Sequence, residues 1–309
     1  MTIAGDRVRR IAATVIPVAS LAILLPTLWR HSSQLREYHW HISPPLLMGS
    51  YAVLFAGFML VVFVWQLLLG RLGLFLRFRR AFEIWYLTNV GRYLPGKVWG
   101  VVWMIHLCEK EGIPKSKAVA SGVITQLFSI ATAFVLGCAY LIFAKAASLK
   151  AAAHWLPVLL VSVGIFFALL ISPKLCLRPV HFILRVFGKP ELPFTLGLSD
   201  RMRFFGLHTL CWLVYGVSFG LFVLSITDVP HTRLLLLIPT FALAYTLGYI
   251  AVLAPSGLGV REGVMVLLLS AFLPATLAIA VAIAARLWFT VGELLFFVVA
   301  WRLQSPLKL

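Results

Sequence analysis

The amino-acid sequence predicts an all-α, polytopic transmembrane helix bundle that forms one integral membrane domain over residues 1–309. The chain is 61% hydrophobic and 12% charged, with a mean hydropathy of +0.98, whereas soluble domains carry about 25% charged residues. Several apolar runs reach the roughly 20 residues that a bilayer-crossing helix needs. Two polar segments rich in Pro and Gly interrupt these runs, a pattern typical of membrane helices broken around a substrate site.

The apolar runs predict the spanning helices in order. The first, 8–29, follows three arginines and resembles a secretory signal, but it exceeds the usual apolar core of a signal, so we interpret it as a retained helix. Further spans are predicted at 46–69, 118–143, 155–172, 204–226 and 274–301. The polar connection 173–203 is predicted to hold a short helix on the membrane surface near 180–187.

The stretch 82–108 is a poor single span. Its polar residues are Glu83, Asn89, Arg92, Lys97 and His106. Each charge at the centre of a membrane helix costs about 2.5–3.5 kcal/mol on insertion scales. Two arms joined at Pro95-Gly96 would each be about 18 Å long, enough to reach the bilayer midplane. The sequence therefore predicts a re-entrant helical hairpin over 82–108.

A second re-entrant hairpin is predicted over 234–273. It consists of the runs 234–253 and 258–273, with Pro255-Ser-Gly-Leu-Gly259 between them. Because the first run is long enough to cross the bilayer fully, the depth of that loop stays open. If the two hairpins enter from opposite faces, they are related as an inverted repeat, which is a known transporter plan.

The distribution of basic residues predicts the orientation. The formal net charge is +17, and with 82–108 re-entrant, 18 Lys and Arg residues fall on one side of the membrane against five on the other. By the positive-inside rule, both termini lie in the cytoplasm and the protein lies in the cytoplasmic (inner) membrane. Anionic lipid explains the basic charge better than nucleic acid does.

The two polar segments are the candidate substrate site. A helix that begins near Leu258 points unpaired amides at the preceding loop, and helix N-termini bind anions. Gly257 and Gly259 allow a ligand to approach the backbone. The cations predicted to hold a phosphate or carboxylate are Arg92, Lys97, Arg261 and Arg286.

Acidic and neutral polar residues complete the predicted site. Glu262 and Glu293 would balance the charge or carry a coupled proton, and Asn89, Tyr93, Gln126 and Ser256 would line a cavity. Two structural alternatives stay open. The cations could pair internally with Glu83, Glu262 and Glu293, or Glu262 could complement the dipole of its own helix start.

Enzyme signatures are missing from the sequence. The only aspartates are Asp6, Asp200 and Asp228, so no paired-Asp motif exists for a metal-dependent transferase. The sequence has no HExxH, GxSxG or P-loop motif. We therefore expect no catalytic residues, no metal site and no cofactor.

Two segments resemble the signatures of a known family. Arg92-Tyr-Leu-Pro-Gly-Lys-Val-Trp99 and Ala254-Pro-Ser-Gly-Leu-Gly-Val-Arg-Glu-Gly-Val264 resemble those of the lysylphosphatidylglycerol synthase transmembrane-region, or flippase-like domain, family. The resemblance covers nearly the whole chain and implies movement of a charged or glycosylated lipid between leaflets. The family includes the membrane half of the multiple peptide resistance factor. No soluble synthetase domain is expected after Leu309, so a separate lipid-synthesising enzyme is an expected partner.

The leading hypothesis is a flippase for a phospholipid or a polyprenyl-phosphate-linked sugar. One alternative is a non-transporting accessory subunit of a glycosyltransferase or lipid-modifying enzyme. Another is a membrane enzyme that uses lipid phosphate as substrate.

Overall fold

The computed structural model describes residues 42–93, 98–143, 163–164, 167–168, 172–186, 188, 194–251 and 255–303. Every regular element in this part of the chain is helical, which confirms the all-α prediction. The predicted first span, 8–29, and most of the predicted span 155–172 lie outside the described residues.

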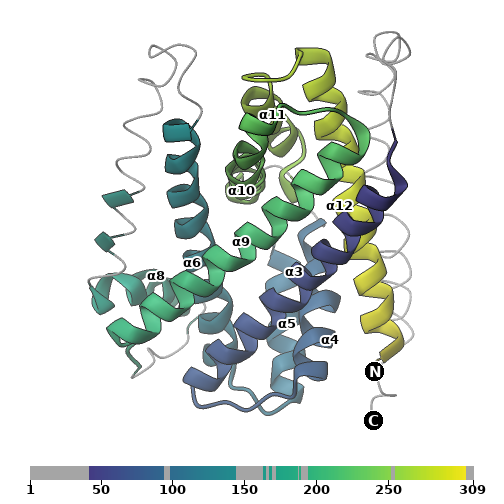
Figure 1. Ribbon diagram of the computed structural model, residues 1–309. Coiled ribbons are helices and arrows are strands. Elements are labelled where there is room, and N and C mark those ends of the chain that lie inside the picture. Colours follow the sequence, from purple (N-terminus) through teal and green to yellow (C-terminus); the bar gives the residue numbers. More distant parts are fainter. Residues whose placement is uncertain are drawn as a thin grey trace.

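Five described helices are long and apolar enough to cross a membrane. They are α3 (Pro44–Arg71), α6 (Lys115–Phe143), α9 (Leu198–Ile226), η2 with α10 (His231–Leu236 and Leu237–Ile250) and α12 (Ala275–Leu303). Helices α3 and α9 lie side by side across the bundle (Figure 1). Gly57 on α3 makes this approach possible, because a Cβ there would lie 2.8 Å from the Tyr215 ring on α9.

The stretch 82–108 forms two short helices separated by a break. Helix α4 (Phe78–Asn89) continues into η1 (Val90–Tyr93), and α5 (Val98–Lys110) follows after residues 94–97, which lie outside the described part. Helices α4 and α5 pack against each other. Gly91 touches the backbone of Gly100, where a Cβ on residue 91 would lie 2.3 Å from the Gly100 nitrogen.

The second polar segment also interrupts a helix. Helix α10 ends at Ile250, a short 3₁₀ turn η3 (Pro255–Gly257) follows, and α11 (Val260–Leu269) packs back on α10. A Cβ on Gly257 would lie 2.5 Å from the carbonyl oxygen of Gly248. Both helix pairs therefore close through a contact between two glycines that lie nine residues apart in the sequence.

The two breaks meet in the middle of the molecule. Turn η1 contacts turn η3, while α4 and α5 lie toward the bottom of Figure 1 and α10 and α11 toward its top. A helix interruption lies within Pro255–Gly259, as the sequence predicts, whereas the turn predicted at Pro95-Gly96 lies outside the described residues. Re-entry of each pair on one membrane face, and the inverted repeat, remain predictions.

Helix α8 (Pro173–Val186) is amphipathic and begins earlier than the helix predicted at 180–187. Leu177, Val180 and Leu184 are buried at helical spacing, whereas Lys174 and Arg178 are exposed. Its apolar face packs on α6.

We expect the Gly91→Ala variant to lower the free energy of unfolding by about 1–3 kcal/mol, because an added methyl would displace the fixed backbone of α5. Gly206→Ala on α9 is the matched control. A Cβ there meets no atom within 4 Å, so alanine should be neutral or stabilising by up to about 1 kcal/mol in a helix. Thermal unfolding in detergent measures both, and equal stability of the two variants would contradict the glycine contact.

Candidate functional site

A cavity of 660 Å³ lies between the helices next to the two breaks. Most of its wall is aromatic or aliphatic, with contributions from α3, α4, α5, α6, α8, α9, α10, η3, α11 and α12. Its polar wall residues include Thr88, Asn89, Thr125, Gln126, Ser129, His208, Ser256, Arg261 and Glu293. A large apolar pocket with a few converging polar groups is the usual form of a ligand site.

Among the described residues, Arg261 is the lysine or arginine that lines the cavity. It lies in the first turn of α11 and is 6% exposed. Its guanidinium carbon is 5.3 Å from the centre of the Phe241 ring, 4.8 Å from that of Tyr245 and 4.7 Å from that of Phe289. Cation–π contacts of this kind contribute about 0.5–2 kcal/mol each. The three rings hold the planar guanidinium in one orientation beside the cavity.

A glycine on α10 lets Arg261 reach this position. A Cβ on Gly248 would lie 2.8 Å from the Cβ of Arg261, and Gly248 also touches Gly257. Both the turn η3 and the start of α11 therefore rest on one glycine of the preceding helix. Gly257 and Gly259 have φ of +70° and +80°, a region where glycine is the favoured residue.

Arg286 secures the turn before α11. It is 1% exposed, and its Nη1 donates to the carbonyl oxygen of Ser256 at 3.0 Å and to Glu262 Oε1 at 3.4 Å. Ser256 has φ of +50°, an uncommon conformation for a residue with a side chain. The Arg286 guanidinium thus stabilises the turn at Ser256, whose backbone conformation is unfavourable by itself.

Glu262 performs both structural roles that the sequence left open. Its Oε2 accepts a hydrogen bond from the Gly259 amide at 2.7 Å, which caps the start of α11, and its Oε1 faces Arg286. A carboxylate in the first turn also complements the positive end of the helix. Arg286 therefore pairs with Glu262, one of the internal partners that the sequence left open.

The predicted site residues divide into two groups. Those that line the cavity are Asn89, Gln126, Ser256, Arg261 and Glu293. Those that build the turn beside it are Gly257, Gly259, Glu262 and Arg286. The side chains of Arg92 and Tyr93, and the whole of Lys97, lie outside the described part of the chain.

Several residues of the cavity were not predicted. The rings around Arg261 read as ordinary core residues of apolar helices, because nothing in their spacing marks a cation. His208 is a single imidazole in an apolar span, 2% exposed. Its position four residues before Trp212, with both lining the cavity, is a helical spacing that could have signalled it.

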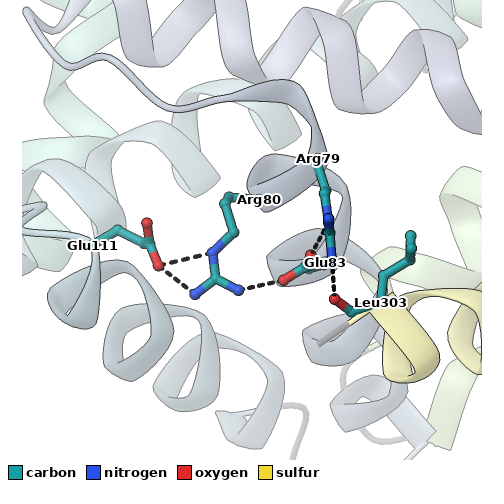
Figure 2. Close-up of polar contacts among 5 residues, drawn as sticks. All are labelled: Arg79, Arg80, Glu83, Glu111 and Leu303. Carbon is teal, nitrogen blue, oxygen red and sulfur yellow. Dashed lines mark hydrogen bonds and ion pairs between the residues drawn. The ribbon is translucent and has the colours of Figure 1, made fainter. Parts of the chain in front are cut away.

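A separate ionic cluster lies at the start of α4 (Figure 2). Glu83 is 1% exposed and binds both Arg79 and Arg80. Arg80 also donates to Glu111 from Nε at 2.9 Å, and Arg79 Nη2 donates to the carbonyl oxygen of Leu303 at 2.6 Å. Glu83 is therefore paired with neighbours on its own helix, and the cluster ties α4 to the ends of α5 and α12.

Comparison with known proteins gives one family. The family described as the lysylphosphatidylglycerol synthase TM region matches residues 11–292, which include both helix breaks and every residue of the cavity wall named above except Glu293. No curated protein matches the chain significantly. The match and the apolar helices identify a multi-pass membrane protein.

Proposed function

We propose that this chain, which belongs to the lysylphosphatidylglycerol synthase TM-region family, moves a lipid with a phosphate-bearing head group across the membrane. The observation that carries the proposal is the buried Arg261, held by three aromatic rings in the wall of a 660 Å³ cavity. A guanidinium binds phosphate through two parallel hydrogen bonds. In a low-dielectric cavity that attraction is stronger than in water.

In this proposal the two arginines have different tasks. Arg261 binds the phosphate, while Arg286 keeps the turn at Ser256 in place through the hydrogen bonds described above. The lipid tails stay in the bilayer and only the head group enters the cavity. Glu293, which also lines the cavity, would balance the charge of Arg261 or carry a coupled proton.

The predicted location is the cytoplasmic membrane with both termini in the cytoplasm. The exposed basic residues Arg71, Arg77 and Arg79 at the α3–α4 connection support this orientation through the positive-inside rule. A partner enzyme that synthesises the lipid is part of the proposal.

A transport assay with the purified protein tests the proposal. Liposomes would carry phosphatidylglycerol labelled with a fluorophore on one tail, so that the head group is unaltered. Dithionite added outside quenches only the outer leaflet in protein-free liposomes. With the protein present, we expect quenching to extend to the inner-leaflet lipid. Quenching equal to that of protein-free liposomes would count against transport and favour the accessory-subunit alternative.

A further inference from the structure

Two buried polar atoms lie in the cavity wall away from Arg261. His208 on α9 is 2% exposed and Thr125 on α6 is 3% exposed, and both line the cavity. Within the described part of the chain, no group forms a hydrogen bond with His208 Nε2 or Thr125 Oγ1. Buried polar side chains in proteins nearly always have a hydrogen-bond partner, so this pair points to a ligand.

The hydrogen bond at the other side of the imidazole defines what His208 can bind. Its Nδ1 lies 2.7 Å from the carbonyl oxygen of Phe204. A carbonyl only accepts, so Nδ1 carries the hydrogen, and in the neutral ring Nε2 is then an acceptor. The ring stacks on Phe128, with centroids 6.0 Å apart and planes at 25°, which fixes the direction of Nε2.

Phe128 relates the position of Thr125 Oγ1 to that of His208 Nε2. Phe128 lies nearly one helical turn beyond Thr125 on α6, so the residue that stacks on His208 shares a helix face with the threonine. The threonine hydroxyl can donate and accept. Together the two side chains offer an acceptor and a group that can do either.

These atoms and Arg261 lie at different places in one cavity. The Tyr245 ring is 4.8 Å from the Arg261 guanidinium and 5.7 Å from the Trp212 ring. Trp212 in turn is about 6 Å along α9 from His208. Two aromatic rings and one helical turn therefore separate the guanidinium from the imidazole.

We propose that His208 and Thr125 bind the hydroxyl groups of a polyol head group, glycerol or sugar, whose phosphate is bound by Arg261. This inference rests on the proposed function, since it names the class of head group that the same cavity takes. A hydroxyl donates to His208 Nε2 and exchanges a hydrogen bond with Thr125. An ionised phosphate oxygen only accepts and does not fit the imidazole nitrogen. An ammonium group donates, but both side chains are uncharged and offer it no counter-ion.

Lipid binding measured by native mass spectrometry tests this without requiring transport. The two probes are phosphatidylglycerol and its di-O-methyl analogue, which has the same tails, charge and phosphate but no hydroxyl. We expect the protein to bind phosphatidylglycerol about tenfold or more tightly, because sites built to bond a hydroxyl reject analogues that lack it. Thr125→Val and His208→Leu should remove most of that preference, and Thr125→Ser should keep it.

Thr132→Val is the matched control. Thr132 is also buried on α6, but its hydroxyl donates to the carbonyl oxygens of Phe128 and Ser129 and it does not line the cavity. This variant should keep the full preference for phosphatidylglycerol.

The outcomes separate the two proposals. Equal binding of the two probes by the wild-type protein would overturn the polyol inference. A preference that survives Thr125→Val and His208→Leu would overturn it as well. A preference lost in those variants, together with no movement of either lipid in liposomes, would support the inference and overturn transport.

Discussion

Arg261→Gln is expected to slow lipid movement by about 10- to 100-fold, the effect of losing a charge-assisted hydrogen bond of about 1.5–3 kcal/mol. Glutamine keeps a polar side chain but has no charge to offer a phosphate in the cavity. The rings of Tyr245 and Phe289, which hold the guanidinium, would remain as an apolar wall. The measurement is the rate of dithionite quenching of tail-labelled phosphatidylglycerol in liposomes.

Two further variants make this result specific. Arg261→Lys keeps the charge but loses the planar fork and its stacking on rings, so its rate should lie between the wild type and Arg261→Gln. Arg203→Gln is the control, because Arg203 is exposed on α9 and does not line the cavity. A wild-type rate in Arg261→Gln, with co-purification of an enzyme, would favour the accessory-subunit alternative.

The helix breaks were predictable from the sequence because helix-breaking and charged residues stand inside otherwise apolar runs. Pro95 and Pro255, each with a glycine within two residues, are not expected to continue a helix, and charges such as Arg261 are expensive in a membrane helix. These residue types therefore marked both interruptions before any tertiary information. The described spanning helices followed equally directly from run length.

The division of tasks among the cations was not predictable. Arg261 and Arg286 look alike in sequence, since each is a single arginine in an apolar helix. What separates them is tertiary: three rings from α10 and α12 surround Arg261, whereas the Ser256 carbonyl and Glu262 face Arg286. Such partners lie 16 or more residues away in sequence, and single-sequence patterns carry no information on that pairing.

Hydropathy also concealed the role of small and aromatic residues. Gly248 reads as an ordinary residue of a membrane helix, but the turn η3 and Arg261 both rest on it. The helical pattern around Tyr245, and that around Phe289, would look the same in the sequence whether the ring faced lipid or a cation. The sequence therefore predicts where polar segments interrupt the membrane helices. The packing of distant helices decides which side chains surround each polar group.

The largest expected loss of stability comes from leaving the Glu83 carboxylate without its arginines. Glu83 is 1% exposed and is bound by Arg79 and Arg80. Breaking a buried ion pair from one side costs about 3–5 kcal/mol, because the remaining charge stays buried. The double variant Arg79→Leu/Arg80→Leu should therefore show a large drop in the thermal unfolding temperature. Single variants should lose less, since one guanidinium still faces Glu83.

Adding Glu83→Leu to that double variant should restore much of the lost stability, because the triple variant has no uncompensated charge and replaces the cluster with apolar contacts. The converse change, Glu83→Gln alone, should be milder. Its arginines are partly exposed, and the hydrogen bond to Glu111 raises the pKa of Arg80 and keeps that guanidinium charged and paired. Arg77→Leu, at an exposed neighbouring position, serves as the control and should change little. If the triple variant were no more stable than the double one, the loss would arise from the contacts of the arginine stems and the Leu303 carbonyl, and not from a stranded carboxylate.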